Sequence, residues 1–386
     1  MFFQSIMIVA PVAAMLLAMI SSTLDAHEID QYTVPTNQEF VDMGTHWNQL
    51  LYDSVRKGVD ETNRQIEAAL QSPTPNQNRL KYLQTPDVLA QAVIDQHPNA
   101  WLMIERWDKM LHSREELDQY PGRILGYRPA AHECIYARVT PLPDPRALVR
   151  IALMRCSMMK VHGVYMGSDK VGHFFHMGHI YYTAYRKSLA AGETVEVALQ
   201  KATEKGKTGV ASENGMIGRA LAGIYSNADL VANYVGLKYF INLTEPITLQ
   251  GRTVLPMVVR NGEYWQLAPH VTPTGPLFAM YVTQHLDEVL NPCVFDWGLK
   301  ESVEKGVEKR KKELLAFYCG DDPRKNCREY FDGIQHECET YFGEDYGHAG
   351  QIDTLVSMGS ICYPTKPVAT PTGTEVQSAG WFKRRF

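Results

Sequence analysis

The sequence predicts a mainly α-helical protein, with a helical core, a small β-hairpin insertion and a cysteine-rich helical C-terminal region. Apolar residues recur at helical spacing through most of the 386-residue chain. One short segment, 247–268, instead alternates apolar and polar residues around the pair Asn261-Gly262, which is a strong hairpin signal. Five of the seven cysteines fall in the last third of the chain, at Cys293, Cys319, Cys327, Cys338 and Cys362.

The N-terminus predicts export. Residues 2–22 are apolar and contain no charged side chain, and the chain becomes polar directly afterwards. This pattern is typical of a secretory signal peptide, here residues 1–26 with Ala26 at the cleavage position. The same apolar segment is long enough to be an uncleaved membrane anchor instead. With either interpretation the bulk of the chain is periplasmic or extracellular, and an uncleaved N-terminus would associate it with a membrane.

Residues 27–130 are expected to form an N-terminal helical region. Helical spacing covers 38–70 and again 86–112, and the first of these segments ends at a Ser-Pro-Thr-Pro breaker. A stretch rich in Pro and Gly follows. The helical core is then expected at 131–245, with a polar site made of His, Asp and Glu residues. Its helices are expected at about 145–160, 168–190, 192–205, 214–223 and 226–241.

Beyond the core, the β-hairpin is expected at 246–275 and the cysteine-rich helical region at 276–363. Helices are expected there at about 276–290 and 299–318. Cys319 and Cys327 flank the turn-forming sequence GDDPRKN and could close a small loop, because exported chains form disulfides. Buried free thiols are the alternative, and the odd number of cysteines leaves at least one unpaired within a monomer. Residues 364–386 have no core-forming pattern and predict a flexible tail.

Composition excludes some functional classes. The formal net charge of −5 gives no basic surface for nucleic acid, so no nucleic-acid partner is expected. The motifs H-E-x-x-H, G-x-S-x-G, Walker A and G-x-G-x-x-G are all absent from the sequence. A site must therefore be recognised from clustered residue types.

The stretch GSDKVGHFFHMGH combines three histidines, an acid and a lysine. If Ser168 is the N-cap of a helix, Asp169 and Lys170 open it, and Asp169, His173 and His176 share one face. Small residues line this face and aromatic residues occupy the other, so the face leaves room for a metal ion, a water or a substrate. The alternative is that Asp169 stabilises the helix dipole and the histidines make hydrogen bonds in the core.

A second polar face is expected on the helix at 226–241. Asp229, Asn233 and Gly236 follow at i, i+4 and i+7 and so lie on one side. A capping box between Ser226 and Asp229 would explain the acid, but it does not explain an amide in mid-helix.

Glu213 opens the Gly- and Ala-rich segment that joins these two helices. Small residues there, at positions 215, 218 and 222, permit close approach of the backbone. We therefore expect Asp169, His173, Glu213 and Asp229 to converge in one polar pocket.

The order and spacing of these residues resemble a group of small bacterial envelope proteins. The shared pattern is D-K-x-x-H-F, an acid about forty residues later, and then S-x-x-D-L-x-x-[DN]-x-x-G. It resembles the YfiM-like lipoproteins and, more remotely, the VanZ-like membrane proteins, over about 165–242. The matching positions are Asp169, Lys170, His173, Phe174, Glu213, Asp229, Leu230, Asn233 and Gly236. The resemblance implies a helical, envelope-associated protein and no particular reaction.

This sequence departs from the family pattern at two points. Asn233 stands where the lipoproteins tend to have Asp, which removes one charge from any cation site. His176 and His179 are not part of the shared pattern, so any role for them rests on their places around the helix.

Two functions are consistent with these residues. The first is an exported metal-dependent hydrolase that acts on an envelope lipid or glycan, with His173, His176 and Asp229 binding a divalent ion such as zinc. In this hypothesis Asp169 orients a histidine and Glu213 is the general base for a metal-bound water. These two acids and Lys170 are the candidate catalytic residues, and Asn233 is a candidate binding residue.

The second function is that of a non-catalytic structural or accessory envelope protein. The Asp–Lys–His–Glu cluster would then be a buried polar network that fixes the register of the helices. Lys170 favours this hypothesis, because a cation next to Asp169 could neutralise the acids without a metal ion.

Overall fold

The computed structural model of the protein describes residues 29–74, 76–130, 132–136, 156–209, 212–215, 218–320, 327–342 and 355–363. The expected signal peptide or anchor and the expected flexible tail lie outside these residues. Within them the protein is mainly helical with several small sheets, so the predicted fold class is confirmed. Among the described residues, no helix combines the length and the apolar character that crossing a membrane requires.

The N-terminal region is helical, as predicted, but one expected helix is divided. Its helices are α2 (Gly44–Leu70), α3 (Gln77–Leu83), α4 (Pro86–Ile94), α5 (Ala100–Leu111) and α6 (Arg114–Leu117). The prediction of a single helix at 86–112 is wrong because Pro98 has no backbone N–H with which to continue a helix. Asn99 then starts α5, since its side chain accepts a hydrogen bond from the backbone N–H of Leu102 at 3.0 Å.

The elements of the helical core are α8 (Lys170–Gly172), η2 (His173–Met177), α9 (Gly178–Ala190), α10 (Val195–Lys207), α11 (Arg219–Ala222) and α12 (Asn227–Asn242). The first three follow one another without a break and confirm the helix expected at 168–190. We call these three elements together the histidine helix. The cap is Asp169 rather than Ser168, because the Asp169 carboxylate accepts the backbone N–H of Lys170. The segment η2 is π-helical, with wider turns than an α-helix.

Two glycines let α12 cross closely over the histidine helix. A Cβ atom at Gly178 would lie 2.7 Å from the backbone of Gly236, and a Cβ at Gly236 would overlap with the backbone carbonyl oxygen of Phe174. The closest crossing of these two helices therefore involves Gly236 of the predicted pattern. The sequence led us to expect that small residues at 215–223 would allow the close approach of the backbone. Of these, Gly218 packs against the backbone carbonyl of Glu213 and not against the histidine helix.

Gly236→Ala should lower the free energy of unfolding by about 1–3 kcal/mol, because the new methyl group would press on backbone atoms that cannot move aside easily. Chemical denaturation measures this loss. Gly333→Ala is a matched control in helix α14 (Cys327–Phe342), where a Cβ atom meets nothing within 4 Å. The control should be neutral or stabilising by up to about 1 kcal/mol. Equal effects of the two variants would contradict the close crossing.

The strands form five small sheets within the described residues. They are β1 (Glu39–Phe40) with β2 (Arg123–Ile124), β3 (Gly126–Tyr127) with β4 (Met158–Val161) and β5 (Val164–Gly167), β6 (Ile224–Tyr225) with β11 (Cys293–Phe295) and β12 (Leu355–Val356), and the hairpins β7 (Ile247–Leu249) with β8 (Arg252–Val254) and β9 (Val258–Asn261) with β10 (Tyr264–Leu267). The hairpin at Asn261-Gly262 is confirmed, with Asn261 opposite Tyr264.

A helix was expected at 145–160, and its last residues form strand β4 instead. Residues 137–155 lie outside the described part of the chain. Strand β4 pairs with β5 across a two-residue turn, in which His162 and Gly163 both have positive φ, at 47° and 83°. Such a turn closes a tight hairpin, so pairing with the next segment overrides the helical spacing.

The helix expected at 276–290 is also wrong. The structure has two short 3₁₀ turns there, η3 (Ala279–Tyr281) and η4 (Gln284–Leu286). Polar side chains in this segment bond to nearby backbone groups: Asp287 accepts from the N–H of Val289 at 2.8 Å, and Asn291 donates to the carbonyl of His285 at 2.8 Å. These local bonds compete with the helical ones.

The C-terminal region has the expected helix and disulfide. Helix α13 (Trp297–Cys319) confirms the one expected at 299–318, and α15 (Met358–Cys362) follows later. Cys319 and Cys327 are disulfide-bonded, with Cα atoms 5.7 Å apart, as their spacing predicted. Cys156, Cys293 and Cys362 are buried thiols.

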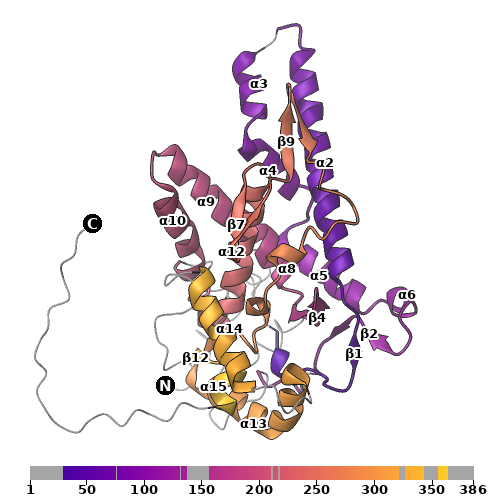
Figure 1. Cartoon of the computed structure of the whole chain (residues 1–386), viewed down its shortest axis with the longest axis vertical. Coiled ribbons are helices and arrows are strands. Elements are labelled where there is room, and N and C mark those ends of the chain that lie inside the picture. The colour runs from indigo at the N-terminus through magenta and orange to yellow at the C-terminus, as the bar shows by residue number, and fades with distance from the viewer. Residues whose placement is uncertain are drawn as a thin grey trace, which may run out of the picture.

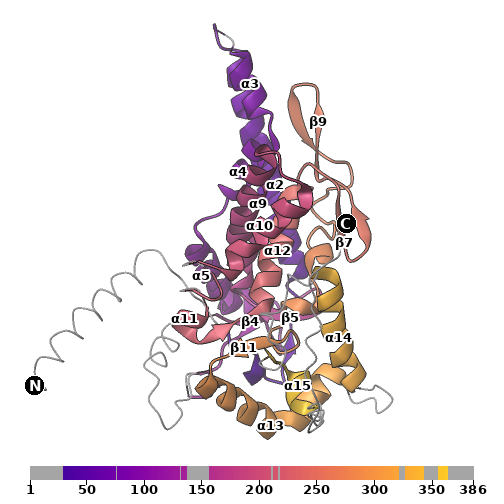
Figure 2. The same ribbon diagram turned by 90° about the vertical axis from the view of Figure 1, so that its left-hand side faces the viewer.

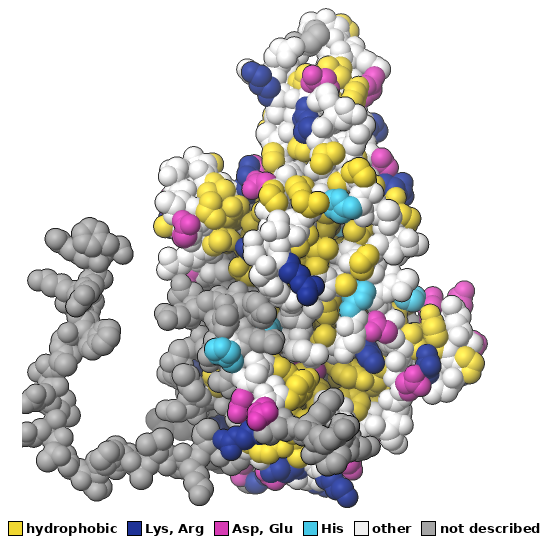
Figure 3. Space-filling model, viewed as in Figure 1, with side chains coloured by type: hydrophobic (Ala, Val, Ile, Leu, Met, Phe, Trp, Pro, Cys, Tyr) yellow, Lys and Arg dark blue, Asp and Glu magenta, His cyan; other side chains and the backbone are white. Residues whose placement is uncertain are grey.

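Two groups of buried apolar side chains form the core. One lies between α2, α4, α9 and α12, and the other joins residues 29–40 to β11 and α13. Figure 1 shows α2 in the upper part of the molecule with α3 and α4 beside it, α9 and α10 on the other side of α4, and α13 and α15 at the opposite end. Figure 2 shows the same arrangement from the side. On the face seen in Figure 3, basic and acidic side chains are interspersed. The histidine helix begins where the two core groups meet, because Met158 belongs to one group and Val171 to the other.

Candidate functional site

Five ionisable side chains from four parts of the chain meet in the interior. Asp169 and Lys170 begin the histidine helix, Asp229 lies in the first turn of α12, Glu213 precedes α11, and Glu288 follows η4. Their exposed fractions lie between 0% and 2%. His173, which is 8% exposed, borders them. We call these six residues the polar cluster.

Lys170 lies at the centre of the cluster. Its Nζ atom is 2.5 Å from Asp229 Oδ1, 2.6 Å from Glu288 Oε1 and 2.9 Å from Asp169 Oδ2. Burial disfavours the charged ammonium, but the three carboxylates outweigh that effect and raise the pKa of Lys170 well above its ordinary value. Lys170 is therefore a permanent cation at any physiological pH.

The carboxylates outnumber this cation. Burial raises the pKa of Asp169, raises the pKa of Glu288 to about 8, and raises the pKa of Glu213 well above its ordinary value. Asp229 differs: burial opposes its ionisation, but His173 and Lys170 hold its pKa below the ordinary value. Four acids thus surround one lysine and one histidine, and the excess of acid must be neutralised by protons or by another cation.

His173 is oriented by its neighbours. Its Nδ1 atom is 2.9 Å from Asn233 Oδ1, and the Asn233 amide donates to the hydroxyl of Tyr181 at 3.3 Å. An amide oxygen facing Nδ1 requires a proton on that nitrogen, which leaves Nε2 as the ligand atom of the neutral ring. Nε2 is 3.6 Å from Asp229 Oδ2. Asn233 therefore turns the free ring nitrogen toward the acids.

Asp169, His173 and Asp229 could hold a metal ion. Each offers one ligand atom, and these atoms all lie within 4.8 Å of one another. Glu213 lies beside them: its Oε2 accepts the backbone N–H of Ser226 at 3.3 Å, and its pKa responds to the charge of Asp229. The four residues expected to converge therefore do so.

His176 lies outside this group. It lies near His97 and Pro98, and burial, followed by the charge of His176, lowers the pKa of His97 to about 3. The π-helical turns of η2 cause the difference, because they rotate each residue less than α-helical turns do and carry His176 away from the face of His173. His179 lies further along, against Tyr182, and burial lowers its pKa to about 4.

Glu288 was not identified from the sequence. It contributes the second-shortest contact to Lys170 and a 3.5 Å contact with the hydroxyl of Ser226. Its one sequence signal was the pair Asp287-Glu288 between the apolar residues Leu286 and Val289, in a segment expected to be helical. Two adjacent acids there would have been unusual on the buried side of a helix.

Comparison of the chain with protein-family models, with curated proteins and with solved structures finds no match. The function has to be argued from the polar cluster itself.

Proposed function

We propose that the protein is an exported, envelope-associated hydrolase that depends on a divalent metal ion held by Asp169, His173 and Asp229. The observation that carries this proposal is the meeting of three ligand atoms within 4.8 Å, in a cluster with more acids than cations. A divalent ion would neutralise that excess without protonation of the acids. The proposed substrate is a lipid or glycan of the cell envelope.

The side chains in this group suit zinc. Zinc binds imidazole nitrogen and carboxylate oxygen at about 2.0–2.2 Å. His173 Nε2 and Asp229 Oδ2 are 3.6 Å apart, which is less than two such bonds placed end to end, so one ion can reach both atoms. Asn233 binds the other ring nitrogen and would fix the orientation of the ligand, as partners of metal-binding histidines commonly do.

A bound zinc ion would supply a water of lowered pKa as the nucleophile. Burial raises the pKa of Glu213 well above its ordinary value, so this residue is suited to hold and donate a proton. To act as the general base, Glu213 would first have to lose this proton, so the charge of the metal ion would have to lower its pKa. Lys170 would position Asp169 and Asp229, because its ammonium contacts both carboxylates.

Three features support the location. The apolar segment 2–22 is typical of an export signal. The disulfide between Cys319 and Cys327 is of the kind that persists in oxidising compartments. The resemblance over 165–242 to the YfiM-like lipoproteins also favours the envelope.

A second function, that of a non-catalytic envelope protein, is favoured by the position of Lys170. Its ammonium lies within 2.9 Å of three carboxylates and already provides the cation that the cluster needs most. In this case the acids with raised pKa values hold protons, and the cluster serves to fix the helices in register.

Metal analysis separates the two functions. The wild-type protein, purified without added metal or chelator, should contain about one zinc or other divalent ion per chain, and a chelator should lower its melting temperature. His173→Ala should lose the ion and the response to chelator. Elemental analysis and thermal melts measure both effects.

His179→Ala is the control, because His179 lies on the same helix but outside the metal-binding group. It should keep the ion. A protein without metal, unaffected by chelator, whose His173→Ala variant loses about 1–3 kcal/mol of unfolding free energy through unpaired buried partners, would favour the structural function.

A further inference from the structure

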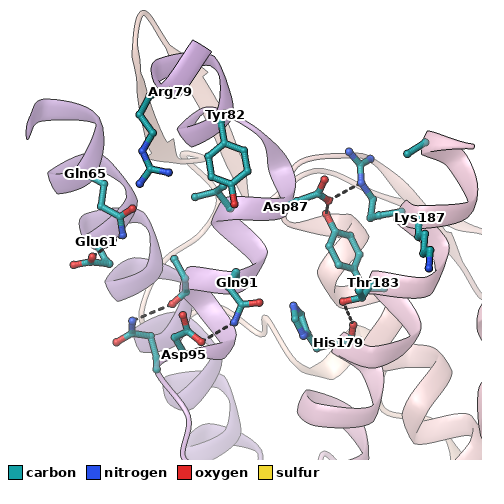
Figure 4. Close-up of a pocket in the computed structure, with 16 residues that line it drawn as sticks. Glu61, Gln65, Arg79, Tyr82, Asp87, Gln91, Asp95, His179, Thr183 and Lys187 are labelled. Atoms are coloured by element: carbon teal, nitrogen blue, oxygen red, sulfur yellow. Dashed lines mark hydrogen bonds and ion pairs between the residues drawn. The ribbon is translucent and has the colours of Figure 1, made fainter. Parts of the chain in front are cut away.

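A cavity of about 770 Å³ opens between α2, α3, α4 and α9, away from the polar cluster. None of the six residues of the cluster lines it. Its volume is that of a small-molecule site. Figure 4 shows Arg79 and Tyr82 entering the cavity from α3, with Lys187 of α9 on the opposite side.

Arg79 and Lys187 are the two cations available to a ligand. Among the described residues, neither makes an ion pair, whereas Arg186, the third cation of the lining, pairs with Asp87 at 2.7 Å. The hydroxyl of Tyr182 also donates to Asp87, at 3.2 Å. The charge of Asp87 is therefore already balanced. Of the two other acids in the lining, Glu61 pairs with Arg64 at 2.6 Å, and Asp95 makes no ion pair with the described residues. An anion entering between Arg79 and Lys187 would meet two cations that have no ion-pair partner.

The rest of the lining offers hydrogen-bond acceptors. Each of three glutamines uses its amide N–H within the protein: Gln65 donates to Glu61 at 2.8 Å, Gln91 to Asp95 at 2.7 Å and Gln96 to the backbone carbonyl of Ala92 at 3.0 Å. In the described part of the chain their Oε1 atoms accept no hydrogen bond. Figure 4 shows Gln65 and Gln91 on the walls of the cavity. Amide oxygens of this kind accept hydrogen bonds from hydroxyl groups.

Tyr82 adds an aromatic surface. Its side chain is 55% exposed, and the guanidinium of Arg79 lies 5.4 Å from the centre of its ring. This cation–π contact holds Arg79 beside the ring before any ligand arrives, which lowers the entropic cost of binding. The ring provides a flat apolar surface next to a positive charge.

We propose that this cavity binds a polyhydroxylated anion, such as an acidic sugar or a sugar phosphate. The acidic group would lie between Arg79 and Lys187, the hydroxyl groups would donate to the glutamine oxygens, and the carbon skeleton would rest on Tyr82. The proposal does not depend on the metal site.

Isothermal titration calorimetry with the full-length mature protein tests this site. Glucuronic acid and glucose 6-phosphate should bind, and the tighter of the two identifies a carboxylate or a phosphate as the preferred anion. Glucose, which lacks the charge, and inorganic phosphate, which lacks the hydroxyl groups, should each bind at least about tenfold more weakly.

Variants locate the binding in the cavity. Arg79→Gln and Lys187→Gln should each weaken binding of the charged sugars about five- to tenfold, and they should leave the metal content unchanged. Lys81→Gln is the control, because Lys81 lies in α3 two residues from Arg79 but does not line the cavity. Equal binding of glucose and glucuronic acid, equal binding of inorganic phosphate, no binding of either charged sugar, or unchanged affinity in Arg79→Gln would each overturn the proposal.

Discussion

Lys170→Met should lower the free energy of unfolding by about 3–5 kcal/mol at pH 7, because it leaves three buried carboxyl groups without the cation that they share. Methionine has nearly the length of lysine, so the loss reflects charge rather than volume. In the variant these carboxyl groups would have to take up protons, and protonation costs less free energy at low pH. The loss should therefore be smaller at pH 5 than at pH 7, as measured by urea denaturation.

Lys312→Met is the control for this effect. Lys312 is an exposed lysine of α13, and the substitution should change the free energy of unfolding by less than about 0.5 kcal/mol. Combining Lys170→Met with Asp229→Asn should restore part of the loss, because the double variant removes one charge of each sign. A loss below about 1 kcal/mol in a protein that contains bound metal would show that the ion, rather than Lys170, neutralises the acids.

The helices of the site were predictable because local signals and tertiary contacts agree there. The segment at 168–190 carries a polar face and an aromatic face, and Asp229 with Asn233 repeats the pattern in α12. The crossing of the two helices needs glycine at 236, which the sequence also displayed. Structure can be predicted from sequence where the local pattern and the tertiary packing favour the same conformation, as they do here.

The predictions that were wrong, and the failure to identify Glu288, have two physical origins. A helical projection assumes uniform turns, and the π-helical segment η2 breaks that assumption at the point where His176 was placed. The second origin is pairing between segments. Strand β4 forms because β5 lies opposite it across a two-residue turn, and Glu288 reaches Lys170 across 118 residues of sequence. Neither contact leaves a local periodicity to detect.

Asp287 should make the protein less stable as the pH rises from about 4 to 7. Burial raises the pKa of its carboxyl to about 7, although the backbone N–H of Val289 donates to it and works against the shift. The folded protein therefore keeps a proton that the unfolded chain, with an ordinary pKa of 3.8, releases earlier. Since the folded state binds more protons in this range, the free energy of unfolding falls as the pH rises.

The expected contribution is roughly 4 kcal/mol, because a shift of about three pKa units is worth about 1.4 kcal/mol per unit. It is fully present below pH 3.8 and is lost once the pH passes about 7. Glu288, with a pKa raised to about 8, changes stability in the same direction. Most soluble proteins, whose carboxylates are stabilised as anions, instead lose stability at low pH. A loss of stability with rising pH would therefore identify carboxyl groups that are buried in the protonated form.

Asp287→Asn isolates this contribution. The amide oxygen can accept the N–H of Val289 as the carboxyl does, and the amide nitrogen replaces the protonated oxygen, so the variant mimics the neutral acid at every pH. Urea denaturation between pH 4 and pH 8, with a chelator present to remove any metal, should give similar stabilities at pH 4 and a more stable variant at pH 8. Lys312→Met, which alters no acid, should keep the wild-type slope. If wild type and Asp287→Asn share one slope, Asp287 is ionised in the folded protein throughout this range, and its burial does not hold a proton on it.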